Sequence, residues 1–358
     1  MKTLIKFELR KILTKRFSLI SIAVILLLSF ILAFSSFQGM HAFDGKSTEG
    51  GGKSAVAIDK AIAAKYEGIL TDEKVQQIMT DFKPTYDLHG MNAKYLYLNA
   101  LQSATFARFS DMDGNWNGLT VSDMFADEEI KVGYINGWLN TSQNMVKVFI
   151  VLSLIIILLI APVFSSEYSG VDNIILTSRY GKTKCAAAKV TASLLASIFI
   201  TLFVSAFNLI VAFAVYGKEG LDCSILFAPL GFVEGYIPFN ITCGTLLKYQ
   251  ILLAFSGAIS VTGITLLLSA LCKSQMIAFV LSAAVHLMPG MLPISETNAL
   301  YRVIVLMPFY HSQFSSIMSV EQMQNGTLYA IWAGPTALIF LGIGAVISRR
   351  IFAKHQVS

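Results

Sequence analysis

Six long runs of apolar residues are the main feature of the chain's hydrophobic pattern. They cover residues 18–37, 148–164, 190–216, 249–271, 276–292 and 328–348. A transmembrane helix needs about 20 predominantly apolar residues, so each run predicts a membrane span. The fifth run is the weakest, because Pro289 and Pro293 limit regular helix near its end.

The segment between the first two runs, residues 38–146, has a different pattern and is too long for a simple connection. Its apolar residues recur at steps of three and four, which is typical of amphipathic helices. Thr71 can cap one of these helices, whose first turn is acidic. We predict helices over residues 55–69, 72–82, 92–109 and 123–144. The segment is therefore expected to form a small, mainly helical domain.

Composition agrees with a membrane protein. The chain has 358 residues, of which 55% are apolar and 14% are charged. Soluble globular proteins carry about 25% charged residues. Water-soluble, disordered and fibrous chains therefore fit this composition poorly. The net charge of +5 could suggest nucleic acid, but its distribution suggests a membrane topology instead, and no nucleic-acid partner is expected.

The basic residues lie in alternate segments between the apolar runs. Fourteen Lys and Arg, against three acidic residues, lie before the first run, between the second and third, between the fourth and fifth, and after the sixth. Residues 38–146 instead hold nine basic and fourteen acidic residues. Because Lys and Arg accumulate in cytoplasmic segments, both termini are predicted to be cytoplasmic and residues 38–146 to lie outside.

These observations predict an all-α polytopic membrane protein with six transmembrane helices. The first run is longer than a signal-peptide core, so we interpret it as a retained signal anchor. The predicted parts are an amphipathic interface helix at 1–16, the first span at 17–37, the extracellular domain at 38–146, the second span at 147–164, a cytoplasmic link at 165–189, spans three to six within 190–348 with extracellular loops at 217–248 and 293–327, and a cytoplasmic tail at 349–358.

The sequence offers no catalytic constellation. Gly181-Lys182-Thr183 resembles the end of a phosphate loop, but Leu176 stands where that loop requires its first glycine. No histidines have the spacing of a metal site. We therefore expect no nucleotide-binding domain, no cofactor, no metal and no enzymatic activity in this chain, and an intramembrane enzyme is disfavoured. His286 falls within the fifth run, where a neutral, hydrogen-bonded histidine facing the bundle interior is favoured over a functional one.

Cys223 and Cys243 both fall in the predicted extracellular loop 217–248. Two outward-facing cysteines in one loop make a disulfide plausible, and closing about 20 residues could contribute about 3 kcal/mol. The alternative is that each is an independent small apolar residue near the membrane.

Two cytoplasmic segments have the features of interaction elements. Residues 1–16 place Lys6, Arg10 and Lys11 opposite an apolar side that includes Phe7. Such a helix can lie among anionic lipid headgroups, or it can be an ordinary basic flank. The link at 165–189 combines Ile174-Ile175-Leu176 with flanking charges. That mixture suits docking onto another protein, and the alternative is a helix lying on lipid.

The amphipathic start, the six spans and this link resemble a membrane permease subunit of an ABC exporter, of the ABC-2 type. Permeases of that family carry Phe-x-x-Glu-x-x-x-Gly, then a Leu-rich turn, a basic patch and a Lys before the next span. The loosely matching residues here are Phe164, Glu167, Gly170, Leu176, Arg179 and Lys189, with Gly170 one position short of the commonest spacing. The resemblance covers the whole chain except residues 38–146.

The resemblance implies a complex of two permeases, as a homodimer or with a sister permease, and two ABC ATPase subunits. The residues implied to couple to the ATPase are Glu167, Gly170, Leu176, Arg179 and Lys189, with Lys6, Phe7, Arg10 and Lys11 on the interface helix. The implied activity is export of a hydrophobic or amphipathic substrate, such as an antimicrobial peptide, a drug or a lipid-like compound, across a bacterial plasma membrane. A non-transporting sensor, whose extracellular domain binds a peptide ligand, is the alternative.

Glu167 stands where the second span leaves the membrane. A carboxylate at that depth is costly unless it is solvated or paired. We therefore predict a cationic neighbour, supplied by the first sixteen residues or by Arg179. The alternative is an exposed glutamate contributing about 0–1 kcal/mol.

Overall fold

The computed structural model describes residues 1–84, 89–168, 181–229, 239–320 and 327–354. The chain divides into two compact units. Unit 1 comprises Met1–Ser29, Met145–Phe207 and Tyr249–Ser358. Unit 2 comprises Phe30–Asn144 and Asn208–Lys248.

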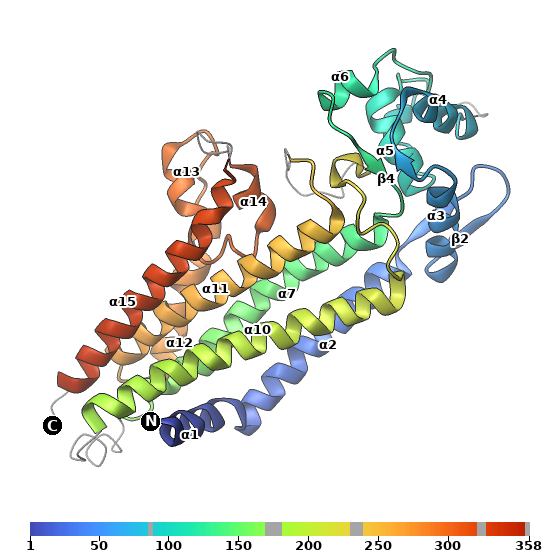
Figure 1. The fold of residues 1–358 in the computed structure, drawn as a ribbon. Coiled ribbons are helices and arrows are strands. Elements are labelled where there is room, and N and C mark those ends of the chain that lie inside the picture. The colour runs from blue at the N-terminus through green and yellow to red at the C-terminus, as the bar shows by residue number, and fades with distance from the viewer. Residues whose placement is uncertain (85–88, 169–180, 230–238, 321–326, 355–358) are drawn as a thin grey trace. The chain divides into compact units, whose positions relative to one another are not determined.

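The described chain is predominantly helical, and five of its helical segments are long and apolar enough to cross a membrane (Figure 1). They are formed by α2 (Arg16–Gln38), α7 (Asn136–Ile160) with the short α8 (Pro162–Ser165), α10 (Ala186–Tyr216), α11 (Cys243–Leu271) and α15 (Ala333–Lys354). Their lengths and composition are those of a multi-pass membrane protein. These segments correspond to five of the six membrane spans that the apolar runs predict.

The fifth apolar run forms a shorter helix, α12 (Gln275–Met291), of 17 residues. This length lies at the lower limit for a transmembrane helix. The helix contains Pro289 and ends two residues before Pro293. The two prolines therefore bracket the end of this helix.

Small and hydroxyl side chains pack the helices of unit 1. A Cβ atom added to Gly344 on α15 would lie 2.0 Å from the carbonyl oxygen of Gly263 on α11. On α10, buried hydroxyl residues recur every four positions, and Ser197 Oγ lies 2.6 Å from Thr262 Oγ1 on α11. Close backbone approach and hydroxyl contacts are typical of helix packing in membranes, where apolar burial alone gives no preference for helix over lipid.

Short helices complete unit 1. A π-helical turn, η2 (Gly181–Cys185), precedes α10, and α13 (Ala299–Ile304), α14 (Phe314–Ser319) and η4 (Tyr329–Trp332) precede α15. Tyr301, Val305 and Val320 form a small apolar cluster in the region of α13, α14 and η4.

His286 on α12 is buried, as expected, with its ring edge-on to Phe309 and the ring centroids 5.9 Å apart. The expected hydrogen bond is missing, because neither ring nitrogen has a partner among the described residues.

Unit 2 contains several short helices and two small antiparallel ladders. The helices are α3 (Lys53–Lys65), α4 (Asp72–Asp81), η1 (Ala93–Tyr95), α5 (Ala100–Phe109), α6 (Val121–Phe125) and η3 (Ile225–Phe227). β1 (His41–Phe43) pairs with β2 (Glu49–Gly51), and β3 (Gly68–Ile69) pairs with β4 (Lys131–Val132). The apolar core of this unit includes Tyr66, Val75, Ile78, Phe82, Phe106, Phe109, Ile130 and Val132.

The helix predictions for this domain are partly wrong. The prediction at 72–82 is confirmed by α4, and Thr71 caps this helix by accepting from Lys74 N at 3.3 Å. The prediction at 55–69 is confirmed only as far as Lys65, where α3 ends, because Gly68 and Ile69 form β3. Residues 92–109 do not form one helix, because Asn99 caps a new helix by accepting from Gln102 N at 2.8 Å. Residues 123–144 are also broken, since Ala126 and Asp127 adopt positive φ and β4 follows them.

The loop predicted at 217–248 contributes to the same unit as residues 38–135, which the sequence does not reveal. Arg108 Nη2 donates to the carbonyl of Leu226 at 2.8 Å, and its Nη1 donates to that of Ala228 at 2.9 Å. Phe227 joins the apolar core. Burial lowers the pKa of Arg108 to about 10, which leaves the guanidinium charged at neutral pH. The domain is therefore assembled from two segments far apart in sequence.

Replacing Gly344 with Ala is expected to destabilise the bundle, because the new methyl group would meet the backbone of Gly263. Overpacking of this kind costs about 1–3 kcal/mol. Gly342→Ala is the matched control, since nothing lies within 4 Å of a Cβ at that position. The measurement is the thermal unfolding midpoint of the detergent-solubilised chain, followed by circular dichroism. Equal midpoints for the two variants would contradict the tight crossing.

Candidate functional site

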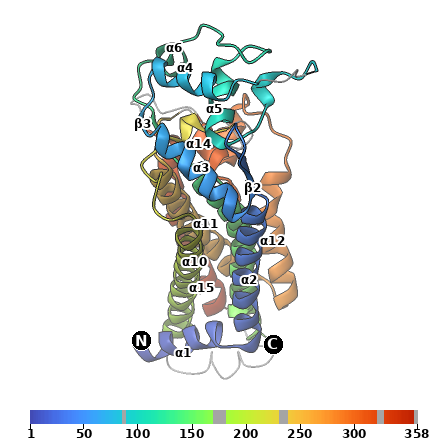
Figure 2. The same ribbon diagram turned by 90° about the vertical axis from the view of Figure 1, so that its right-hand side faces the viewer.

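The amphipathic start of the chain forms α1 (Lys2–Leu13), which lies crosswise to the beginning of α2 (Figure 2). Thr14 ends α1, and Ser18 Oγ fixes the bend by donating to the carbonyl of Ile12 at 2.5 Å. The buried face carries Glu8 and Ile12, which are four residues apart and therefore on one side of the helix. A carboxylate thus occupies the buried side of a basic helix.

Glu8 belongs to a cluster of four charged side chains in unit 1, of which Glu8, Glu167 and Lys189 are buried and Lys11 is half-buried. At its centre is Lys189, near the start of α10, whose side chain is 0% exposed. Its Nζ lies 2.5 Å from Glu167 Oε1 and 3.4 Å from Glu8 Oε2, and donates to the carbonyl of Val163 at 3.1 Å. All three acceptors are required, because an ammonium group removed from water is stable only when it is paired and hydrogen-bonded.

Glu167 receives a second cation from α1. Lys11 Nζ donates to the same Oε1 atom at 2.9 Å. This contact confirms that Glu167 has a cationic neighbour from the first sixteen residues. The alternative of a solvated glutamate is wrong, since the side chain is only 3% exposed. Its other oxygen, Oε2, has no hydrogen-bond partner among the described residues.

The cluster stands on a well-packed base at the end of α8. Ser269 Oγ on α11 accepts from the backbone N–H of Phe164 at 2.9 Å and donates to the carbonyl of Ala161. The ring of Phe164 packs on Phe352 of α15, with centroids 5.2 Å apart. Tyr168 donates its hydroxyl to the carbonyl of Ala270 at 2.8 Å. The backbone that carries Glu167 is therefore attached to both α11 and α15.

The charges in the cluster balance, with two carboxylates against two ammonium groups. Burial alone lowers the pKa of Lys11, but its hydrogen bond to Glu167 and the charges of Glu167 and Glu8 together raise it above the ordinary value. Lys15 lies at the edge of the cluster, and burial together with the nearby Lys11 lowers its pKa. Lys11 is thus held as a cation, whereas Lys15 lacks equivalent support.

The structure brings together only part of the predicted site. Glu167, Lys189 and Lys11 meet in the cluster. Lys6, Phe7 and Arg10 are exposed on α1. Gly170, Leu176 and Arg179 lie outside the described residues, so their predicted role stays a prediction. Sequence reasoning missed Glu8, although it is one of only three acidic residues in the predicted cytoplasmic segments.

Cys223 and Cys243 lie opposite each other in unit 2. The N–H of Cys243 donates to the carbonyl of Cys223 at 3.0 Å, beside the antiparallel bridge between Ser224 and Thr242. Directly paired residues of antiparallel strands have Cα separations of about 5.5 Å, which a disulfide can span. Both cysteines are free thiols in the structure. The predicted disulfide therefore stays a prediction that the backbone pairing permits.

Comparison of the chain with protein-family models, with curated proteins and with solved structures finds no match. Functional assignment therefore rests on the residues and geometry described above.

Removing the central lysine tests the cluster. Lys189→Met keeps the length of the side chain but leaves Glu167 and Glu8 with less compensation, which is expected to cost about 3–5 kcal/mol. Lys354→Met removes an exposed lysine at the end of α15 and should change stability by less than about 0.5 kcal/mol. The thermal midpoints of the purified variants give the comparison.

A double variant adds a second criterion. Glu167→Gln combined with Lys189→Met should lose less stability than the sum of the single variants, because the partners interact directly. Additive losses would contradict a direct pair.

Proposed function

We propose that the chain is the membrane-spanning permease subunit of an ABC exporter of the ABC-2 type. A separate ATPase supplies the energy, and the substrate is a hydrophobic or amphipathic compound moved outward across the plasma membrane. The observation that carries the proposal is the buried pair between Glu167 and Lys189, 2.5 Å apart. These two residues stand near the two ends of the predicted cytoplasmic link 165–189.

The pair supports this function because it clamps the two ends of the link together. Lys11 and Glu8 extend the same cluster to α1. The link and the amphipathic helix are the two elements implied to contact an ATPase. Because the cluster joins both elements to α8 and α10, a movement of either element is transmitted to these two helices and is not absorbed by a flexible connection.

The energetic requirement is that the ATPase binds two arrangements of the permease with different affinities. The cluster of Glu8, Lys11, Glu167 and Lys189, here called the clamp, is suited to this task. Its ion pairs are costly to separate, so α1, α8 and α10 would move together as a unit. The exposed side of α1 supplies the contact surface. Phe7 on that side is 64% exposed, and Arg10 and Lys6 flank it.

The apolar faces of the helices in unit 1 support an assembly within the bilayer. Ile20 on α2, Ile277 on α12 and Leu338 on α15 are all more than half exposed in the single chain. Such surfaces need lipid or a protein neighbour. In the proposed complex, lipid covers some of them and a second permease copy covers others.

The proposed topology has six spans, including the 17-residue α12, with both termini cytoplasmic. Reporter fusions at Gly50, Gly181 and Ser358 should report outside, inside and inside. The expectation follows from the excess of Lys and Arg in the predicted cytoplasmic segments. A cytoplasmic signal at Gly50 would contradict the proposed topology and therefore the exporter proposal as well.

The function itself is tested by purifying the tagged chain from its native membranes in digitonin. A stoichiometric ABC ATPase should copurify, and the complex in liposomes should hydrolyse ATP, while the chain alone should not. A stoichiometric partner without a phosphate loop, such as a signalling kinase, would instead support the sensor.

Within that complex, Glu167→Gln tests the coupling role. It removes a charge from the clamp, so ATPase binding should persist while substrate-stimulated ATP turnover falls at least about tenfold, equivalent to about 1.4 kcal/mol. Glu128→Gln, in an exposed position of unit 2, should turn over ATP like the parent. Parental turnover by Glu167→Gln would remove the coupling role from this residue.

A further inference from the structure

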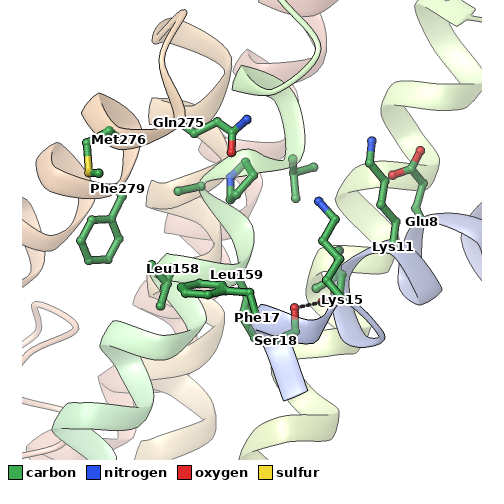
Figure 3. A pocket seen from close by; sticks show the side chains of 14 residues that line it. Glu8, Lys11, Lys15, Phe17, Ser18, Leu158, Leu159, Gln275, Met276 and Phe279 are labelled. Atoms are coloured by element: carbon green, nitrogen blue, oxygen red, sulfur yellow. Dashed lines mark hydrogen bonds between the residues drawn. The ribbon is translucent and has the colours of Figure 1, made fainter. Parts of the chain in front are cut away.

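A cavity of about 430 Å³ opens beside the buried cluster in unit 1 (Figure 3). One wall comes from the junction of α1 and α2, a second from the end of α7 and the beginning of α8, and a third from the beginning of α12. Its volume falls in the range of small-molecule sites. Two members of the charged cluster, Glu8 and Lys11, also line this cavity.

The polar side of the cavity is basic. Lys11 and Lys15 line it, together with the Glu8 carboxylate that lies 3.4 Å from Lys189. Lys11 is shared with Glu167, yet its side chain remains 33% exposed. No carboxylate among the described residues lies within ion-pair distance of Lys15. The cavity therefore holds one cation, Lys15, that is not paired with a carboxylate of the described residues.

The beginning of α12 adds to the attraction for an anion. Gln275 is the first residue of the helix and lines the cavity. The N-cap residue, Ser274, makes no side-chain hydrogen bond to this helix end. Free N–H groups and the positive end of the helix dipole favour negative charge at this position.

The remaining walls are apolar and lead toward the exposed faces of the helices. Phe17, Met276 and Phe279 line the cavity, and Met276 is 70% exposed. In Figure 3, Lys11 and Lys15 lie on the α1 side, whereas Gln275, Met276 and Phe279 lie on the α12 side. A soluble anion would need only the lysines, but a phospholipid would use both the basic and the apolar surfaces.

We propose that this cavity binds the headgroup of an anionic phospholipid, with the phosphodiester against Lys15 and Lys11 and the glycerol and first acyl methylenes against Phe17, Met276 and Phe279. The site requires only that the chain is embedded in a membrane, so it is independent of the exporter proposal. A bound lipid would share Lys11 with Glu167 and would stabilise α1 against the beginnings of α8 and α12.

The binding test uses the full-length chain in detergent with dioleoylphosphatidylglycerol as the probe, and native mass spectrometry measures the apparent Kd. Lys15→Gln should weaken binding about fivefold, the effect of one lysine on an anionic lipid. Lys6→Gln is the matched control, because it removes the same charge from an exposed position of α1 that does not line the cavity. It should change Kd by less than about twofold.

A second variant tests the α12 side without weakening the fold. Gln275→Glu adds a negative charge at a helix start, which suits the helix dipole but repels a phosphodiester. It should retain the parental thermal midpoint in detergent and lose lipid binding about fivefold or more. Gln275→Glu with parental lipid affinity would overturn the site.

Other probes identify the ligand. Inorganic phosphate that competes with the lipid at similar concentration would overturn the proposal in favour of a soluble-anion site. If dioleoylphosphatidylcholine binds as tightly as the anionic lipid, the proposed recognition of an anionic headgroup is overturned and only an apolar contact remains. Equal weakening by Lys15→Gln and Lys6→Gln would overturn a defined site in favour of diffuse attraction to the membrane surface.

Discussion

The arrangement of unit 1 near the chain's start depends on one interaction, the pairing of the fully buried Lys189 ammonium with Glu167. A charge in that environment is tolerated only because Glu167, Glu8 and a backbone carbonyl surround it. The acceptors come from two parts of the chain, because Glu8 lies on α1 whereas Val163 and Glu167 lie four residues apart, in and just after α8. The need to compensate one lysine therefore fixes the positions of α1, the end of α8 and the start of α10 together.

The cluster and the adjacent cavity share their charges. Lys11 contacts Glu167 and also lines the cavity, while Lys15 lies at the edge with no carboxylate of its own among the described residues. Clamp and ligand site are consequently linked by electrostatics: an anion that enters the cavity changes the environment of the cation that holds α1. A lipid bound in the cavity would therefore affect α1, one of the elements that the exporter proposal assigns to the ATPase contact.

Unit 2 depends on a different constraint, the hydrogen bonding of the partly buried Arg108 guanidinium. Arg108 donates to carbonyls of Ala104, Leu226 and Ala228, so it joins α5 to a segment more than a hundred residues away. Ion pairs between Lys60 and Glu219 and between Lys131 and Asp222 connect the same two segments. A ligand bound by the domain would therefore act on both segments at once.

The sequence by itself determined the features that depend on local pattern. Apolar runs identified the long helices, three- and four-residue steps identified α3 and α4, and the position of Glu167 required a cation. Tertiary structure decided where periodicity stops and which charges meet. Asn99 interrupts an apolar pattern that continues on both sides, and Glu8 lies 181 residues from Lys189. Hydropathy and helical spacing report on neighbours within a few turns, whereas the pairing of buried charges depends on packing between segments that no local pattern specifies.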